Sequence, residues 1–418
     1  MKLKIVALLL LLFLVSCFST RDLSSTNMVS YYKPTEHMTH PEFVLENQSD
    51  SSLKVYIRIK PDEFLFVRQT DETFKSFINV VAEVVTSYES LKTLDSASAR
   101  FALDMTDKSK QKLLSLSLPV RHSGLLLVHI TMFDLNRNSS DDFFVPLDRE
   151  ASPSRNDFLL CGKSGQPLFR NYLSSTDTFR LNYKNRELDS VWCRYYHREF
   201  ILAPPPYTFD MHEEFVYAPD SLFKIAVNDS NGIVLPNEGF YQFQTDTSNY
   251  TGFTIYRFTS GFPSVVSPAQ MIEALRYLLT KREYETMKTN PNLKAAVDEF
   301  WLSRGGGAEK TRALIKKYYG RVQEANRLFT SYTEGWRTDR GMIYIIFGMP
   351  TTINLGAESE SWIYGTAGSS LAVNFFFTKV NNPFTYNDYT LSRTPIYEAN
   401  WYRAVETWRQ GRAYNSFN

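Results

Sequence analysis

The period of the hydrophobic pattern changes once along this chain of 418 residues, and that change constrains the fold more than any other feature. Up to about residue 262, apolar and polar residues alternate with a period of two, which is typical of strands with one buried face. From about residue 263 the period is near 3.6, which is typical of amphipathic helices. The pattern therefore predicts a multidomain chain with two β-sandwich domains followed by an α+β domain.

The two β domains are predicted at residues 41–150 and 151–262. In the first, alternating segments such as Leu53 to Ile59 are separated by polar turns, which favours an immunoglobulin-like sandwich. The segment Ile78 to Val85 carries apolar residues on both faces and predicts a central strand. The second domain has shorter, more aromatic strands, and its Pro204-Pro205-Pro206 run predicts a loop or a sheet edge.

Residues 263–418 are predicted to hold several helices and a few strands. Ser267-Pro268-Ala269-Gln270 combines an N-cap, a proline at the first helical position and a capping-box glutamine. Further helices are predicted from Asn290, from about 308 to 330 and near 399–412. Gly305-Gly306-Gly307 should separate the first two of these. Strands are predicted at Met342 to Phe347, Ser361 to Tyr364 and Leu371 to Lys379.

The first 17 residues resemble a bacterial lipoprotein signal. Eleven apolar residues from Ile5 to Val15 follow two lysines, and this run is shorter than the roughly 20 residues that span a bilayer. Leu14-Val15-Ser16-Cys17 resembles a lipobox, which predicts a signal peptide at 1–16, palmitate-type acylation of Cys17 and a lipidated tether at 17–40. Phe18 is not the Asp typical of inner-membrane retention, so the resemblance implies the periplasmic side of the outer membrane. The alternative is an ordinary signal peptide with an incidental cysteine.

The cysteines, the net charge and the absence of known motifs reduce the number of function classes that fit this sequence. Cys161 and Cys193 would lie in an oxidising compartment, where they either form a disulfide or remain two separate buried thiols. The 46 Lys and Arg against 45 Asp and Glu give a net charge of +1, which disfavours a nucleic-acid partner. The histidines and cysteines match no metal-site spacing, and no G-x-S-x-G nucleophile motif is present. We expect no metal and no cofactor.

The densest motif lies between residues 334 and 364. Its candidate structural or binding residues are Gly335, Trp336, Thr338, Asp339, Arg340, Gly341, Gly348, Pro350, Glu360, Trp362 and Tyr364. With Tyr318 to Val322, Ala325-Asn326 and Phe329 upstream, this segment resembles the GWxTD-domain family of envelope proteins from Gram-negative bacteria. The resemblance covers about the last third of the chain and implies no particular reaction.

The residues of the motif also suggest physical roles. Gly341 suits a turn with positive φ before a strand, and Asp339 could accept backbone N–H groups in that turn. Trp336 is large enough to fix the connection against the helices. Arg340 and Glu360 would form a bidentate ion pair between neighbouring strands. The motif then serves as a structural junction, as a ligand or partner site, or, as a third alternative, in catalysis.

These observations lead to one functional hypothesis and one alternative. The hypothesis is an outer-membrane-anchored periplasmic lipoprotein that acts as a non-catalytic interaction or scaffold protein in envelope assembly or secretion. Its partners would be the membrane, through the lipid, and another envelope protein. The alternative is a periplasmic glycan-binding or glycan-processing protein, because 15% of the residues are aromatic. Exposed Trp and Tyr beside two carboxylates would favour the glycan protein, and buried aromatic residues would favour the interaction protein.

Overall fold

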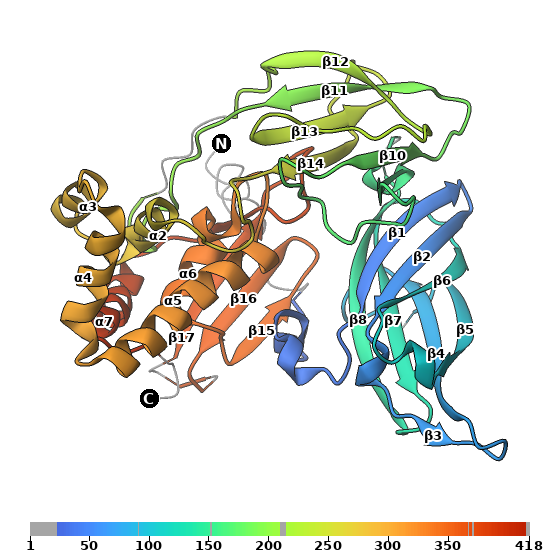
Figure 1. Ribbon diagram of the computed structural model, residues 1–418, viewed down its shortest axis with the longest axis horizontal. Coiled ribbons are helices and arrows are strands. Elements are labelled where there is room, and N and C mark those ends of the chain that lie inside the picture. Colours follow the sequence, from blue (N-terminus) through green and yellow to red (C-terminus); the bar gives the residue numbers. More distant parts are fainter. Residues whose placement is uncertain are drawn as a thin grey trace, which may run out of the picture.

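A β-rich N-terminal region and a C-terminal region with helices make up the computed structural model (Figure 1). The structure describes residues 23–90, 92–150, 153–209, 215–366, 368–369 and 372–414. The predicted signal peptide and Cys17 lie outside these residues. No helix in the described ranges has both the length and the apolar character needed to cross a bilayer.

Two antiparallel sheets enclose the first core. One contains β1, β2 and β6, and in the other β4 pairs with β3, β5 and β7, while β7 also pairs with β8. Their bounds are β1 Glu42–Ser49, β2 Ser52–Ile59, β3 Val67–Arg68, β4 Phe74–Val85, β5 Asp95–Asp104, β6 Lys112–Pro119, β7 Leu125–Asp134 and β8 Ser139–Asp148. Short 3-10 helices occur at Pro61–Glu63 and Met105–Asp107.

The alternating pattern predicts the buried faces of these strands correctly. Leu53, Val55 and Ile57 of β2 are fully buried, as period two requires. In β4 the outcome differs, because from Ile78 to Val84 only alternate residues are buried and the other face stays partly open. A central strand in a sheet that is covered on one side needs only one apolar face, so the expectation of two buried faces was wrong.

The second β region packs a two-stranded sheet, β9 with β10, against a four-stranded sheet in the order β12-β11-β13-β14. The bounds are β9 Phe158–Gly162, β10 Phe179–Tyr183, β11 Ser190–Tyr196, β12 Ser221–Ala226, β13 Gly239–Gln244 and β14 Phe253–Arg257, with a 3-10 helix at Arg155–Asp157 before β9. Phe179, Leu181 and Phe243 are buried in the shared core.

The two cysteines of this region, for which the sequence left a disulfide and separate thiols open, are free buried thiols. Cys193 of β11 lies in the shared core with Leu160, whereas Cys161 follows Leu160 in β9 and therefore points to the opposite face of that strand. Burial raises the pKa of the Cys161 thiol to about 11 and raises the pKa of Cys193 as well. The alternative of two separate buried thiols is the correct one.

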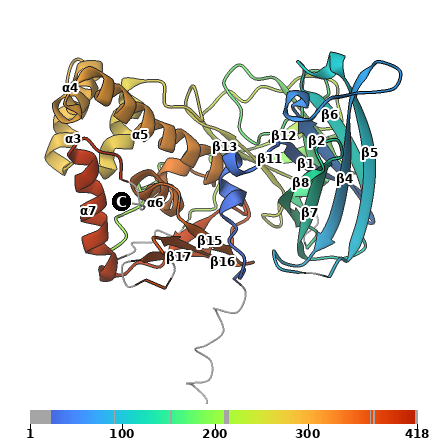
Figure 2. The ribbon, with the colours of Figure 1, turned by 90° about the horizontal axis from the view of Figure 1, so that it is seen from below.

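The C-terminal region combines helices with one antiparallel sheet in the order β15-β16-β17-β18. The helices are α2 Pro268–Ala274, α3 Lys281–Lys288, α4 Leu293–Gly305, α5 Ala308–Leu328, α6 Asp339–Phe347 and α7 Glu398–Arg409, with 3-10 turns η6 Leu275–Tyr277, η7 Gly335–Arg337 and η8 Pro395–Tyr397. The strands are β15 Thr352–Leu355, β16 Ser359–Tyr364, β17 Val373–Lys379 and β18 Tyr389–Leu391. Figure 2 shows α6 beside this sheet, and aromatic contacts such as Phe347 on Phe375 join the two layers.

Sequence signals at helix ends are confirmed, and one strand prediction is wrong. The Ser267 side chain accepts from the Gln270 N–H in a reciprocal capping box, and α4 ends before Gly306 in the left-handed region. Residues 342–347, predicted as a strand, form most of α6. Every residue of α6 is buried. Its apolar run therefore has no polar face, and it shows neither the period of 3.6 of an amphipathic helix nor the period of two of a half-buried strand. Thr338 caps the helix by accepting from the Gly341 N–H at 3.1 Å.

The segment before β1, predicted as part of a tether, belongs to the fold from residue 23 onward. The N–H groups of Ser24 and Met28 donate to the carbonyls of Leu355 and Ile353 at 2.8 and 2.7 Å, along the edge of β15. Two 3-10 turns follow, η1 Val29–Tyr32 and η2 Pro34–Glu36. Tyr32 is buried in the core of the C-terminal region. Figure 2 shows this segment between the two halves of the molecule.

Candidate functional site

The motif residues meet where η7, α6 and β16 pack together, and Arg340 lies at their centre. Its Nη1 is 2.8 Å from Glu360 Oε1 and donates to the Tyr32 hydroxyl at 3.1 Å, while Nη2 donates to the Asn387 carbonyl at 2.9 Å. The predicted ion pair is therefore present. It joins a helix to a strand through one nitrogen of Arg340, whereas two strands and a bidentate pair were expected.

The remaining acceptor capacity of Glu360 is also occupied. Tyr32 donates to Oε1 at 2.7 Å, and the Trp362 indole N–H donates to Oε2 at 3.0 Å. The side chains of Arg340 and Glu360 are only 1% and 3% exposed. Burial by itself lowers the pKa of Arg340, but the Glu360 carboxylate together with Tyr32, Tyr389 and Asp388 outweighs that effect, and the pKa is raised. Burial, followed by the Glu360 charge, raises the pKa of Tyr32, so its hydroxyl remains a donor.

Asp339 makes a second buried ion pair that the sequence did not indicate. Arg393 Nη1 donates to Asp339 Oδ2 at 3.1 Å, and Arg393 Nη2 also contacts Oδ1. The Leu391 N–H donates to Oδ2 at 2.7 Å. Asp339 thus accepts a backbone N–H from β18. No local signal marks Arg393, because it lies 54 positions after Asp339 in the chain.

The glycines of the motif permit close packing of backbones. A Cβ on Gly341 would lie 1.8 Å from the Gly335 carbonyl oxygen, and a Cβ on Gly335 would lie 2.0 Å from the Ala325 carbonyl oxygen. Gly341 is helical and does not have the positive φ that was expected. These two residues are glycine because α5, η7 and α6 approach one another too closely for any side chain.

Trp336 is 4% exposed and is held from several sides. Its backbone N–H donates to Asn326 Oδ1 at 3.1 Å, its indole N–H donates to Glu334 Oε2 at 3.1 Å, and its carbonyl accepts from the Tyr277 hydroxyl at 2.9 Å. Glu334 Oε2 also accepts from Arg337 Nε at 2.8 Å. The tryptophan therefore joins the end of α5 to the turn that begins α6.

The end of α6 is closed by the remaining motif residues. Gly348 has a φ of +84°, and its carbonyl accepts from the Tyr364 hydroxyl at 2.7 Å. Buried Arg321 donates to the Ile345 and Ile346 carbonyls at 3.0 and 3.2 Å, which satisfies two of the last acceptors of the helix. Pro350 is buried just beyond. All eleven motif residues therefore contribute to, or lie within, one packed junction.

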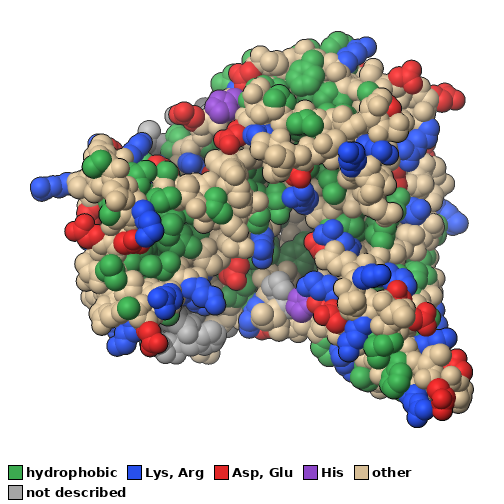
Figure 3. Space-filling model, in the orientation of Figure 1, with side chains coloured by type: hydrophobic (Ala, Val, Ile, Leu, Met, Phe, Trp, Pro, Cys, Tyr) green, Lys and Arg blue, Asp and Glu red, His purple; other side chains and the backbone are tan. Residues whose placement is uncertain are grey.

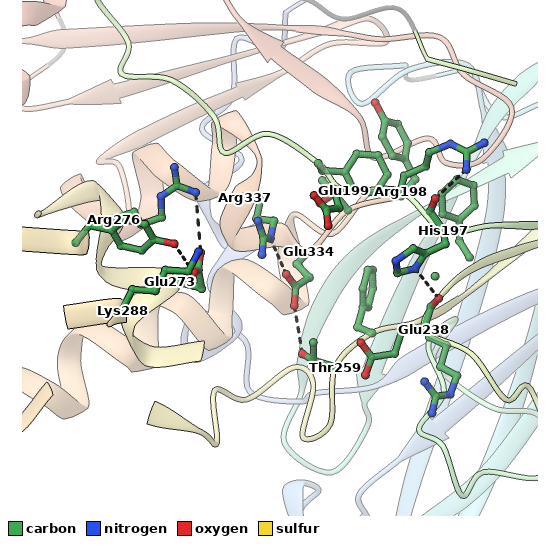
Figure 4. Close-up of a pocket in the computed structure, with 18 residues that line it drawn as sticks. His197, Arg198, Glu199, Glu238, Thr259, Glu273, Arg276, Lys288, Glu334 and Arg337 are labelled. Atoms are coloured by element: carbon green, nitrogen blue, oxygen red, sulfur yellow. Dashed lines mark hydrogen bonds and ion pairs between the residues drawn. The ribbon is translucent and has the colours of Figure 1, made fainter. Parts of the chain in front are cut away.

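A polar cavity of about 390 Å³ borders this junction (Figure 4). It lies between α2, α3, the motif residues Glu334 and Arg337, and one end of the β11-β13-β14 sheet. Apart from His197, its charged lining residues are Arg198, Glu199, Glu238, Arg257, Glu273, Arg276, Lys288, Glu334 and Arg337. No sequence motif pointed to this set, because its members come from six separate segments.

Some of these charges are paired within the protein and others are not. Arg198 lies 2.7 Å from Asp220, and Glu273 lies 3.9 Å from Arg276 and accepts from the Tyr284 hydroxyl at 2.5 Å. Arg257 is 8% exposed, and its buried Nε has no hydrogen-bond partner within the described part of the chain. A buried guanidinium in that state is unusual and calls for an explanation.

A larger, more apolar groove of about 700 Å³ lies beside η6, whose Arg276 lines both spaces. The proline run forms one wall, and α7 forms another. The Ala203 N–H donates to the Arg337 carbonyl at 3.0 Å, so this loop lies directly on the motif. Ile201 and Tyr402, 62% and 54% exposed, stand at the groove.

Within the described residues, no group of three or more His, Cys, Asp or Glu side chains is placed to hold a metal ion. Charges of both signs are interspersed over the face shown in Figure 3, without a continuous basic area. This distribution agrees with the net charge of +1.

Comparison with known proteins gives one informative match. No curated protein matches the chain. Among solved structures, red sea bream transglutaminase is similar at 10% identity with a TM-score of 0.19, over 55% of this chain and 33% of the enzyme, so this chain spans about a third of that protein's length. At this TM-score the likeness supports no inference. The family model of the GWxTD domain matches residues 239–410, beginning at the first residue of β13 rather than at the predicted boundary of 263. The C-terminal portion of this chain is therefore a GWxTD domain.

Proposed function

We propose that this chain is a lipid-anchored protein on the periplasmic side of the bacterial outer membrane, where it acts as a non-catalytic interaction or scaffold protein. In this proposal Cys17 carries the lipid, and two sandwich domains of immunoglobulin-like type precede the GWxTD domain in the chain. The observation that carries the proposal is the burial of the motif. Arg340, Glu360 and Trp336 are 1%, 2% and 4% exposed and bind one another or neighbouring backbone. A catalytic group must reach a substrate, and these groups are occupied by the fold.

The placement of the tryptophans favours the same proposal over a glycan protein. Sugar recognition by stacking needs exposed flat rings. Five of the six tryptophans are buried: Trp301, Trp336, Trp362, Trp401 and Trp408. The aromatic content that motivated the glycan alternative is therefore used mainly for packing.

The experiment is affinity purification from detergent-solubilised membranes. Its variants distinguish residues that bind a partner at the surface from residues that stabilise the fold. Ile201→Ser with Tyr402→Ser changes exposed side chains at the groove, and Leu222→Ser changes a 46% exposed apolar residue on β12 as a control. We expect the groove variant to lose co-purifying protein while melting as the wild type does, and the control to retain both properties.

Trp336→Ala tests the scaffold role of the motif. Removing this buried ring should cost about 3–5 kcal/mol of unfolding free energy. Partner recovery should then fall only in proportion to the loss of folded protein. If Trp336→Ala melts like the wild type but loses its partner, the motif is a binding surface and the proposed role is wrong.

A further inference from the structure

The polar cavity beside the GWxTD junction has features of a ligand site that the scaffold role does not use. Its volume of about 390 Å³ falls within the range of small-molecule pockets. Apolar rings such as Phe200 and Phe258 share its walls with charged groups. Figure 4 shows charged side chains on two sides of the cavity, His197, Arg198, Glu199 and Glu238 at the sheet end and Glu273, Arg276 and Lys288 on the helices.

Arg257 is the strongest indication of a ligand. It ends β14, lies opposite Gly239 in the strand register and lines the cavity. It is more than nine-tenths buried, its Nε lacks a partner, and no ion pair is formed to its guanidinium by the described residues. Burial of an unpaired charge is costly, and it is relieved when an anion binds. The planar guanidinium fork matches a carboxylate with two parallel hydrogen bonds.

Two carboxylates lie at the same end of the sheet. Glu238 directly precedes Gly239, the register partner of Arg257, and Glu199 follows the end of β11. Both side chains line the cavity and are without a hydrogen-bonding or ion-pair partner in the ranges that the structure describes. The end of the sheet thus presents one unpaired cation and two unpaired anions.

We propose that this cavity binds a small zwitterion, such as an α-amino acid or a short peptide, with its carboxylate on Arg257 and its ammonium group toward Glu199 and Glu238. Five cationic side chains also line the wall, but Arg198, Arg276 and Arg337 are paired with carboxylates of the protein. The remaining charges, Arg257 and Lys288 against Glu199 and Glu238, sum to zero, which favours a zwitterion over a multiply charged anion such as phosphate. The aromatic walls favour an apolar side chain on the ligand. This inference does not depend on the membrane anchor or on the scaffold role.

Calorimetric titration of the full chain in detergent tests the proposal with a matched set of probes. L-phenylalanine and L-alanyl-L-phenylalanine carry both charges, 3-phenylpropanoate lacks the amine, and 2-phenylethylamine lacks the acid. We expect at least one of the two zwitterions to bind about 10-fold or more tightly than both single-charge analogues. Comparing the affinities of the free amino acid and the dipeptide then shows whether the cavity prefers an amino acid or a short peptide.

Variants assign the binding to the cavity. Arg257→Met should weaken binding of the better zwitterion by about 10- to 100-fold, and Arg257→Lys should weaken it less. Arg312→Met, which removes an exposed arginine of α5, should leave it unchanged. Glu199→Gln with Glu238→Gln should weaken the zwitterion but not 3-phenylpropanoate. Because Arg257 has no partner among the described residues, Arg257→Met should melt at or above the wild-type temperature.

Several results would overturn the proposal. They are no binding of either zwitterion, equal affinity for 3-phenylpropanoate, Arg257-dependent binding of inorganic phosphate in their place, or unchanged affinity in Arg257→Met. A marked drop in the melting temperature of Arg257→Met would also contradict it, because Arg257 would then be paired within the fold.

Discussion

Arg340 and Glu360 carry opposite charges inside a core that excludes water, and each satisfies the other. Removing one partner leaves the other charge buried without compensation, which typically costs about 3–5 kcal/mol. Removing both charges together leaves no isolated ion. The pair is therefore a structural unit, and its two residues should not contribute independently to stability.

A double-mutant cycle measures this coupling. We expect Arg340→Met and Glu360→Gln each to lower the unfolding free energy, and the double variant to lower it by less than their sum, with a coupling of about 0.5–3 kcal/mol. Urea unfolding provides the free energies. The exposed pair Lys294 and Asp298, 2.6 Å apart on α4, is the control and should couple by at most about 0.5 kcal/mol. Additive effects at Arg340 and Glu360 would contradict the buried-pair description.

Two glycines give a second prediction at the residue scale, because they have opposite surroundings. Gly341→Ala would force a Cβ against the Gly335 carbonyl and should cost about 1–3 kcal/mol or more. Gly320 lies inside α5, and nothing is within 4 Å of a Cβ placed there. Gly320→Ala should therefore stabilise the protein by about 0.5–1 kcal/mol. Thermal melting of both variants checks the pair, and shifts of the same sign would refute the packing argument.

At the scale of elements, α3 is tied to α7 by a charged contact. Glu283 lies 2.9 and 3.0 Å from the two terminal nitrogens of Arg409, and it also closes the capping box at the start of α3. The hydrogen bond from Arg409 is the main cause that lowers the pKa of Glu283 from 4.5 to about 2. A carboxylate with a lowered pKa contributes stability above its unfolded pKa and loses that contribution as the pH falls toward its folded value.

The stability difference between the wild type and Glu283→Gln should therefore depend on pH in a defined direction. We expect the wild type to be more stable by about 1 kcal/mol at pH 6 and the difference to disappear between pH 4.5 and 2. Glu285→Gln, at an exposed position of the same helix, is the control and should show no such difference. Melting curves at several pH values test this, and a difference that grows in acid would show that the sign is wrong.

At the scale of the whole molecule, the N-terminal segment is part of the GWxTD core. Tyr32 contacts both Arg340 and Glu360, which are more than 300 residues away in the chain. If Cys17 carries a lipid, only a few residues separate the anchor from Ser24, which is bonded to β15. The proposed anchor would then hold the GWxTD domain close to the membrane.

Membrane fractionation tests this arrangement. Cys17→Ser should release the protein from a salt-washed membrane fraction, because the acyl chains on Cys17 are the proposed anchor. Cys161→Ser is the matched control, since its thiol is buried and free, and it should remain with the membrane. Retention of Cys17→Ser after the wash would mean that the lipid is not on Cys17 or that a partner suffices.

Local patterns in the sequence determined the helices and strands that have one buried face and one solvent-exposed face. Alternation predicted the buried face of β2, and Ser267 with Gln270 predicted the start of α2, because strand period and capping act between residues close in the chain. The tertiary structure alone decided α6, which is buried on every side and so has no period to read. It also decided the separation of Cys161 from Cys193, the partners Tyr32 and Arg393, and the unpaired state of Arg257. These depend on which distant segments pack together, and a pattern of neighbouring residues carries no record of that packing.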